Sequence, residues 1–427
     1  MFIDIYLLLL LVISVGFLIY SYYFNNKDIA EPNTGTFLVC SISMVFALIG
    51  NSSWRKEFLL ETFIYLLIGF AVITCTSLFI RKNKIRLVIK ANESKIISFK
   101  EFRRIEISYK IILTTLISLF LTIIYVFSVK TRGIQNVNFW IRQGIKIVMA
   151  TAYVNSFIFV NNFMSKKRKH IDLILLIPTL CGFICSYFTG VRTEILRLII
   201  AVLIYFVVLI QERNSWKSKK EEIKKIISKA IIPLLLFLMA FFVMRSVIKD
   251  ADIGENMHYG FLMYLAFYIG SPWVVFNQKI ALGIANYRGT VFGHLTFGVL
   301  WDDIIDFGLF HGNRVPTKTF TSLDDTLQVN GNVDTMFGSP LIDFGPIGML
   351  VFIGITYLFL NWFYFKYIKN SYSSPRRNLK LVFYAFFYYI VAISFYSCGV
   401  TFIVSFYYII TLILIWVIWQ FYFKLKF

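Results

Sequence analysis

Apolar runs of about 20 residues alternate with short polar stretches along most of the chain. An α-helix of that length crosses the ~30 Å hydrocarbon core of a bilayer. The pattern therefore predicts an all-α, polytopic integral membrane protein with about 11 transmembrane helices, folded as a single membrane domain over residues 1–427. The expected spans are 3–24, 36–51, 58–80, 111–129, 141–164, 171–189, 194–210, 230–248, 340–365, 381–398 and 400–423.

The composition agrees with this class of protein. Hydrophobic residues make up 58% of the chain and aromatic residues 19%, while only 15% are charged, against roughly 25% in soluble domains. The first apolar run has no basic stretch before it and no small-residue cleavage site after it, so we expect a first span and not a cleavable signal peptide. The five cysteines lie in apolar runs without the spacing of metal ligands, so we expect them in the core.

Basic residues are concentrated in every second connection between the spans. These connections and the C-terminal tail hold 29 of the 43 Lys and Arg residues. Because cytoplasmic loops are enriched in Lys and Arg, we expect the N-terminus outside and the C-terminus inside. The basic stretches 81–110 and 211–229 are then cytoplasmic loops, either amphipathic helices on the inner leaflet or solvated connectors. The net charge of +20 indicates contact with the lipid bilayer and not with nucleic acid.

One long polar segment, 249–339, interrupts the pattern and is expected on the extracytoplasmic side. It is rich in Gly, Asn, Thr and acidic residues. A loop this long is usually functional. Two aromatic, apolar pieces within it, 259–276 and 295–310, predict helices that lie at the interface or re-enter the membrane, with a hidden pair of full spans as the alternative. Tyr268 in the first piece suits either an interfacial aromatic belt or the floor of a sugar-binding site.

Arginine is the first chemical signal beside this loop. Five arginines lie within the loop or in apolar segments and turns next to it: Arg192, Arg197, Arg245, Arg288 and Arg314. Arginine in or near a membrane is costly and usually functional, and its planar fork matches phosphate oxygens. The alternatives are snorkelling to lipid phosphates or a local ion pair with Glu194.

His294 and Asp343 are the candidates for proton transfer. An imidazole on the outer face can accept a proton near neutral pH, although a lone His beside Gly293 is often structural. Asp343 stands at the mouth of span 340–365, where it could also cap the helix. The sequence contains no HxxxH or HExxH metal-binding motif and no nucleotide-binding motif, so we expect metal-independent chemistry without a cofactor.

Three stretches resemble motifs of the O-antigen and capsular oligosaccharide repeat-unit polymerases of the flippase-dependent pathway. They are Thr189-Gly190-Val191-Arg192-Thr193-Glu194-Ile195-Leu196, Tyr268-Ile269-Gly270-Ser271-Pro272 with Asn277, and Asn332-Val333-Asp334-Thr335-Met336-Phe337 running into Ile342-Asp343-Phe344-Gly345-Pro346-Ile347-Gly348. The layout of apolar runs is also similar to that family over nearly the whole chain. Arg192 matches the arginine of the family's turn, and Asp343 matches its Asp-Phe-Gly acid. At Asp334 the family often carries another residue.

The resemblance implies a glycosyltransferase at the outer face of the bacterial cytoplasmic (inner) membrane. It would polymerise undecaprenyl-pyrophosphate-linked oligosaccharide repeat units into O-antigen or capsular polysaccharide. The expected catalytic residues are His294, Asp343 and Arg192, and the expected substrate-binding residues are Arg197, Arg245, Tyr268, Asn277, Arg288, Arg314 and Asp334. His294 and Arg288 match no motif of the family and are assigned from their chemistry, as proton acceptor and phosphate ligand.

Other functions remain open at this stage. An O-antigen ligase shares a large outer loop, and a lipid-linked oligosaccharide flippase or other transporter shares the many spans. A structural or partner-binding subunit is the third alternative. For the polymerase, the expected partners besides its lipid-linked substrates and the bilayer are a chain-length regulator and the flippase.

Overall fold

The protein is a bundle of long helices with a small hairpin, described here from a computed structural model. The structure describes residues 4–54, 57–88, 104–133, 136–165, 169–189, 192–213, 266–284, 291–310, 321–324, 329–331, 333–369 and 374–423. Within these residues, nine helical segments are long and apolar enough to cross a membrane. This confirms the expectation of a polytopic, multi-pass membrane protein.

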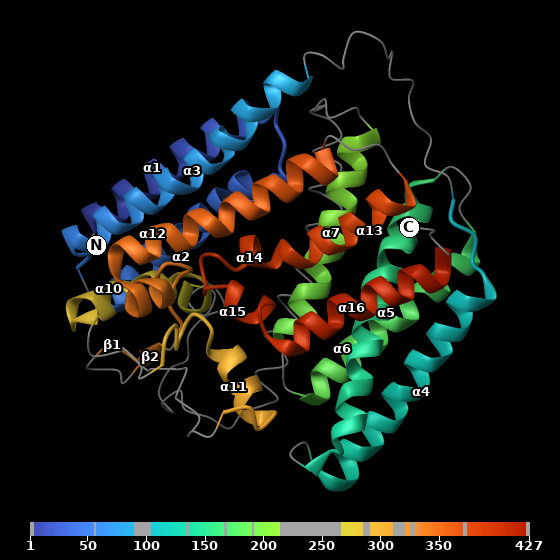
Figure 1. The fold of residues 1–427 in the computed structure, drawn as a ribbon. Coiled ribbons are helices and arrows are strands. Elements are labelled where there is room, and N and C mark those ends of the chain that lie inside the picture. The colour runs from blue at the N-terminus through green and yellow to red at the C-terminus, as the bar shows by residue number, and fades with distance from the viewer. Residues whose placement is uncertain are drawn as a thin grey trace.

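The first half of the chain forms seven long elements and the second half is more broken (Figure 1). The first group is α1 (Ile5–Phe24), α2 (Pro32–Trp54), α3 (Leu60–Val88), α4 (Tyr109–Arg132), α5 (Phe139–Met164), η2 (His170–Leu176) continuing into α6 (Ile177–Thr189), and α7 (Arg192–Arg213). The second group is η3 (Ala266–Gly270), α10 (Ser271–Ala281), α11 (Gly298–Asp306), β1 (Thr321–Asp324), β2 (Val329–Gly331), α12 (Gly338–Phe363), η5 (Tyr364–Lys369), α13 (Pro375–Phe387), α14 (Tyr389–Ala392), α15 (Val400–Ile403) and α16 (Phe406–Phe423).

The expected spans match helices at most positions. The first seven correspond to α1 through α7, and the span expected at 340–365 corresponds to α12. The span expected at 230–248 lies outside the described residues, as do 89–103 and 214–229 of the basic loops. The count of eleven is therefore not established.

The expectation of one continuous helix over 381–398 is wrong. α13 ends at Phe387, α14 adds one turn, and residues 393–399 form turns before α15 begins. The carbonyl of Ser394 accepts a hydrogen bond from the Met336 amide (2.8 Å) and not from the next helical turn. At the end of these turns, Gly399 lies so close to the backbone of Ile390 that a Cβ would approach its Cα to 2.7 Å. Hydrophobicity alone predicts a span here, but a long-range backbone bond interrupts the helix.

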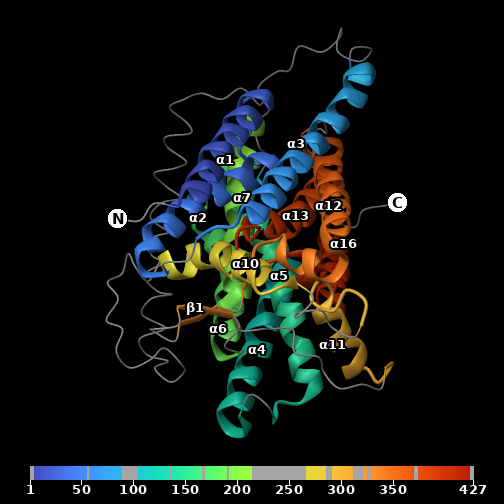
Figure 2. The same ribbon diagram turned by 90° about the vertical axis from the view of Figure 1, so that its left-hand side faces the viewer.

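Two large apolar clusters divide the bundle. One joins α1, α2, α3 and α10 with the first part of α12. The other joins α5, α7, α13 and α16 with the last turns of α12 and η5. Figures 1 and 2 show α1 to α3 in one half of the molecule and α4 to α6 in the other, with α7, α13 and α14 between them. α12 is therefore the helix that both halves share.

The long polar segment contributes two short helices. α10 has 11 residues and α11 has nine, so neither reaches the ~20 residues of a full span. Nearly every residue of α10 is buried. Gly270 allows this packing, since a Cβ there would lie 2.4 Å from the backbone nitrogen of Ala47. Trp273 is fully buried and donates its Nε1–H to Ser43 Oγ (2.8 Å), so it is a core residue and not part of an interfacial belt.

The all-α expectation needs one small amendment. β1 and β2 pair as an antiparallel hairpin with Thr321 opposite Gly331. The hairpin lies within the segment expected to form the large loop, on the side of α10 (Figure 1). The fold is thus an α-helical bundle with one short two-stranded hairpin.

Candidate functional site

The first part of α12 is broken at Gly345. This residue has φ 72° and ψ −177° inside the helix, and Pro346 follows it. That region of backbone space is open essentially only to glycine. A proline has no amide hydrogen to donate, so the helical ladder cannot close across the break. The turn that carries Asp343 is consequently separate from the long remainder of α12.

The carboxylate of Asp343 binds a loop from elsewhere in the chain. It accepts the backbone N–H of Leu295 (3.0 Å to Oδ2) and of Thr296 (2.6 Å to Oδ2). Hydrogen bonds to a carboxylate are about twice as strong as neutral ones. Because its carboxylate binds these two amides, and because α12 begins five residues earlier at Gly338, Asp343 does not cap the start of α12. It fixes residues 291–297, which we call the His294 loop.

His294 is held at the centre of this loop. It is 4% exposed, and neither ring nitrogen has a hydrogen-bond partner among the described residues. Buried polar atoms without a partner are rare and call for an explanation. Gly293 makes the loop possible, because its φ is +63° and a Cβ would lie 2.5 Å from Phe297. Thr401 in α15 donates its hydroxyl to the Thr296 carbonyl (2.8 Å) and secures the other side of the loop.

Aromatic rings surround the His294 loop. Phe344 lies 5.1 Å from Phe292 and 6.3 Å from Phe297, measured between ring centroids. Phe292 is exposed, and its carbonyl accepts the indole N–H of Trp301 (3.0 Å). The loop thus combines a buried imidazole and a carboxylate with an exposed aromatic surface, a combination that suits contact with the apolar faces of sugars or with lipid.

A buried ion pair lies just before α12. Lys279 Nζ of α10 and Asp334 Oδ2 are 2.8 Å apart, and the two residues are 4% and 5% exposed. Gly338 makes room for the carboxylate, since a Cβ there would come within 2.3 Å of Asp334 Cγ. Sequence reasoning named Asp334 but missed Lys279. The signal was present, because a lysine in an otherwise buried apolar helix needs a counter-ion.

Arg197 is enclosed in the core of the second half. Its guanidinium carbon lies 3.8 Å from the ring centroid of Tyr408 and 4.2 Å from that of Tyr389. Nη1 is 3.2 Å from Glu194 Oε1, which also accepts the hydroxyl of Tyr408. Arg197 is 0% exposed. The local pair with Glu194 that the sequence left open is therefore formed, and the aromatic rings add cation–π attraction.

Asn277 also has a structural environment. Its Oδ1 accepts the Leu59 amide (2.9 Å) and the Thr62 hydroxyl (2.8 Å), and its Nδ2 donates to the Glu57 carbonyl (2.8 Å). These bonds satisfy the start of α3. Tyr268 is half-buried in η3.

The remaining site predictions fall at the limits of the structure. Arg192 is the first residue of α7, and its side chain is not described. Arg245, Arg288 and Arg314 lie outside the described residues. Of the three residues predicted to be catalytic, the structure thus brings His294 and Asp343 together, through the two amides that follow His294.

One nearby carboxylate on α11 is perturbed by burial. Burial raises the pKa of Asp303, while the hydrogen bond from the Phe406 amide (2.6 Å) opposes the shift. Among the described residues, no three His, Cys, Asp or Glu side chains lie close enough together to hold a metal ion. The described residues bring an imidazole, a carboxylate and backbone amides to the His294 loop, and these groups can donate or accept hydrogen bonds.

Comparison with protein-family models, with curated proteins and with solved structures gave no match. What the protein does must therefore be argued from its own residues and geometry.

Proposed function

We propose that the protein is a polysaccharide polymerase. It transfers a growing oligosaccharide from undecaprenyl pyrophosphate to the next lipid-linked repeat unit at the outer face of the cytoplasmic membrane. The proposal rests on the motifs quoted above and on one structural observation. That observation is the buried imidazole of His294, with both ring nitrogens unpartnered among the described residues, next to amides held by Asp343.

The proposed reaction needs few protein groups. A sugar hydroxyl of the acceptor attacks the anomeric carbon of the donor, the bond from that carbon to the pyrophosphate oxygen breaks, and a glycosidic bond forms. His294 takes the proton that the hydroxyl loses, which is the role of a general base. Asp343 positions the His294 loop through its two backbone bonds. Arg192 at the start of α7 is the proposed partner of the pyrophosphate that leaves.

The aromatic surface supports the same class of substrate. Phe292 is exposed, and Trp301 lies beside it through the bond from its indole N–H to the Phe292 carbonyl. Pyranose rings pack their C–H faces on such rings, and polyprenyl chains require apolar contacts.

A gel of surface polysaccharide tests the proposal. A strain lacking the protein is compared with strains that carry the wild-type gene, His294→Gln or Arg192→Ala on a plasmid. We expect a ladder with wild type and a single repeat unit without it. For His294→Gln we expect a loss of about 100-fold or more in polymer formation, the size of a general-base effect.

The chain offers a matched histidine control. His170 is exposed at the start of η2, so His170→Gln is expected to give a wild-type ladder. Membrane levels of each variant are measured by immunoblot. Wild-type chain lengths in His294→Gln would remove His294 from the reaction. Loss of even the single repeat unit in the strain lacking the protein would instead point to a flippase or a ligase.

A further inference from the structure

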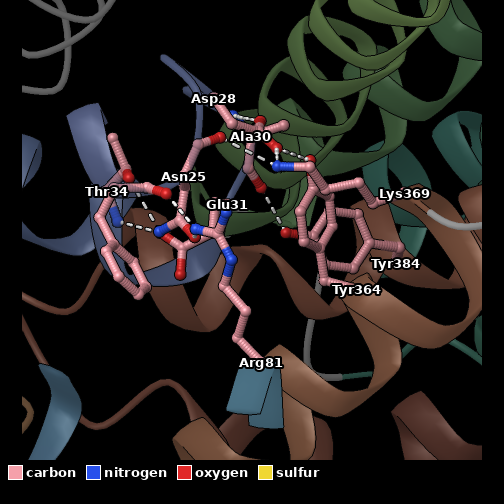
Figure 3. Close-up of polar contacts among 10 residues, drawn as sticks. Asn25, Asp28, Ala30, Glu31, Thr34, Arg81, Tyr364, Lys369 and Tyr384 are labelled. Carbon is pink, nitrogen blue, oxygen red and sulfur yellow. Dashed lines mark hydrogen bonds and ion pairs between the residues drawn. The ribbon is translucent and has the colours of Figure 1, made fainter. Parts of the chain in front are cut away.

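A second buried polar cluster lies at the other end of α12, where the connection between α1 and α2 meets η5 (Figure 3). The connection turns sharply, since Asn26 and Lys27 both have positive φ, 59° and 60°. L-residues rarely adopt this conformation, and two in a row persist only when neighbouring contacts hold them.

Asp28 supplies those contacts. Its Oδ2 accepts the ammonium of Lys369 (2.8 Å) and the hydroxyl of Tyr364 (2.6 Å), while its Oδ1 accepts the amide of Ala30 (3.1 Å). Lys369 also donates to the Asn25 carbonyl (3.0 Å). Both oxygens of Asp28 therefore have partners, and the side chain ties the connection to the end of α12.

Glu31 lies three residues further on and is different. It is 0% exposed. Its Oε2 accepts the Thr34 amide (2.7 Å) and the Thr34 hydroxyl (2.8 Å), which caps the start of α2. Its Oε1 is buried and has no hydrogen-bond partner among the described residues. A charged carboxylate oxygen that is buried without a partner is much more costly than a neutral one, so this environment favours the protonated carboxyl.

The charged and titratable groups around Glu31 form hydrogen bonds or ion pairs with other residues. They come from the connection itself, from α3, η5 and α13, and from the residue between α13 and α14. They are Asp28, Arg81, Tyr364, Lys369, Tyr384 and Tyr388. Lys369 and Tyr364 bind Asp28. Arg81 donates to the Phe24 carbonyl and to Asn25 Oδ1 (3.4 Å). Tyr384 donates to the Ala30 carbonyl and Tyr388 to the Ile29 carbonyl. No cation is paired with Glu31 among the described residues.

Burial without a counter-ion disfavours the charged form of a carboxyl group. Burial raises the pKa of Glu31 to about 7. The two hydrogen bonds from Thr34 and the positive charge of Lys369 act against this rise, whereas the negative charge of Asp28 adds to it. The perturbed group belongs to the connection and lies outside the membrane-spanning segments, which end at Phe24 and resume at Pro32.

We propose that the buried carboxyl of Glu31 is a proton-binding site that takes up and releases a proton. The stretch of α12 and η5 from Asp343 to Tyr364 corresponds to about 30 Å, so the site is at the opposite end of the helix from the His294 loop. In the predicted topology this end is cytoplasmic. Asn26 and Lys27 of the same connection are exposed.

Proton release has a defined structural consequence. With the proton bound, the ammonium of Lys369 stays with the carboxylate of Asp28. Without the proton, Glu31 and Asp28 both carry charge and compete for the same ammonium, which lies on η5 at the end of α12. The protonation state of Glu31 thereby changes the contact at the end of α12, the helix that carries Asp343. This site does not depend on the glycosyl transfer proposed above.

Infrared difference spectroscopy of the wild-type protein in lipid nanodiscs tests the assignment. The C=O stretch of a protonated carboxyl is followed from pH 5 to pH 9 with the solvent exchanged on both faces. We expect one such band to titrate with a midpoint near pH 7 and to be missing in Glu31→Gln. The amide of the glutamine keeps an oxygen for Thr34, so this variant preserves the cap.

Substitutions of Thr34 test the same assignment while the Glu31 carboxyl stays in place. Thr34→Val removes the hydroxyl bond to the charged form, so the midpoint should rise by about one pH unit, while Thr34→Ser should leave it unchanged. Glu61→Gln is the control for an exposed glutamate and should retain the band. A band that titrates near pH 4.5, or one unaffected by both Glu31→Gln and Thr34→Val, would overturn the proposal. A midpoint that falls with sodium chloride but not with choline chloride would overturn it in favour of a sodium site.

Discussion

The buried pair of Lys279 and Asp334 allows a quantitative test of the region before α12. Asp334→Asn removes one charge with almost no change of shape and takes away the carboxylate that the buried Lys279 ammonium contacts. Breaking one side of a buried ion pair usually costs about 3–5 kcal/mol, because the remaining charge has lost its compensation. The 2.8 Å contact and exposures of 4% and 5% place this pair among the fully desolvated ones.

The double variant separates the pair from its surroundings. The double variant Lys279→Met/Asp334→Asn has no charge at either position. Its loss of unfolding free energy should be about 2 kcal/mol smaller than the sum of the losses in the two single variants. Gly338 packs against Asp334 Cγ, so Asn is preferred to a larger apolar residue at this position.

The free energy of unfolding is measured by denaturant titration in mixed micelles. Lys130→Met, at an exposed lysine in the last turn of α4, is the control and should change stability by less than about 0.5 kcal/mol. If Asp334→Asn is as stable as wild type, the reasoning on the buried pair is wrong. If it is stable but binds lipid-linked substrate more weakly, Asp334 is the substrate ligand that the sequence predicted.

Three further predictions concern single residues. Asp343→Asn keeps one oxygen for both amides but carries no charge, so we expect a loss of about 1–3 kcal/mol in unfolding free energy together with a shortened polysaccharide ladder; a normal ladder would show that the His294 loop needs no carboxylate charge. Gly345→Ala should lower the unfolding free energy by about 1–3 kcal/mol, because residue 345 has a φ of 72°. Gly354→Ala is the control and should be neutral or stabilising, because an added Cβ would meet only Val72, at 3.5 Å. Equal thermal midpoints in the two variants would contradict the break at 345. The pKa of Glu31 is raised above its unfolded value, so its stability contribution is present below about pH 4.5 and is lost as the pH rises through 7, a fall of about 3 kcal/mol that Glu31→Gln should not show in titrations at several pH values.

The long helices were predictable because their cause is local. A run of about 20 apolar residues needs only its own backbone bonds and a lipid environment, so α1 through α7 and α12 follow from hydrophobicity. The break over 393–399 depends on a bond between the Ser394 carbonyl and the Met336 amide, 58 positions apart in the chain. The pattern of apolar and polar residues along the sequence cannot predict a contact between residues so far apart.

The candidate site was predictable as a set of residue types but not as an arrangement. His294 and Asp343 were singled out for their chemistry, and their connection through Leu295 and Thr296 emerges only in the folded chain. Arg197 shows the opposite case. Its charge suggested a phosphate ligand, yet rings from α14 and α16 enclose the guanidinium, and these helices follow it by about 200 residues.

α12 relates the two ends of the molecule. Its long part from Pro346 to η5 is continuous, so a change in the Asp28–Lys369 contact acts on that part as a whole. The turn with Asp343 is held separately, by the His294 loop and by the anchored segment at Met336. A displacement of the long part must then be absorbed at Gly345, where the helical ladder is already broken and no Cβ restricts the backbone. Coupling between the Glu31 end and the His294 end is therefore expected to change in Gly345→Ala and to persist in Gly354→Ala, which can be checked by following the pH dependence of polymer length in both variants.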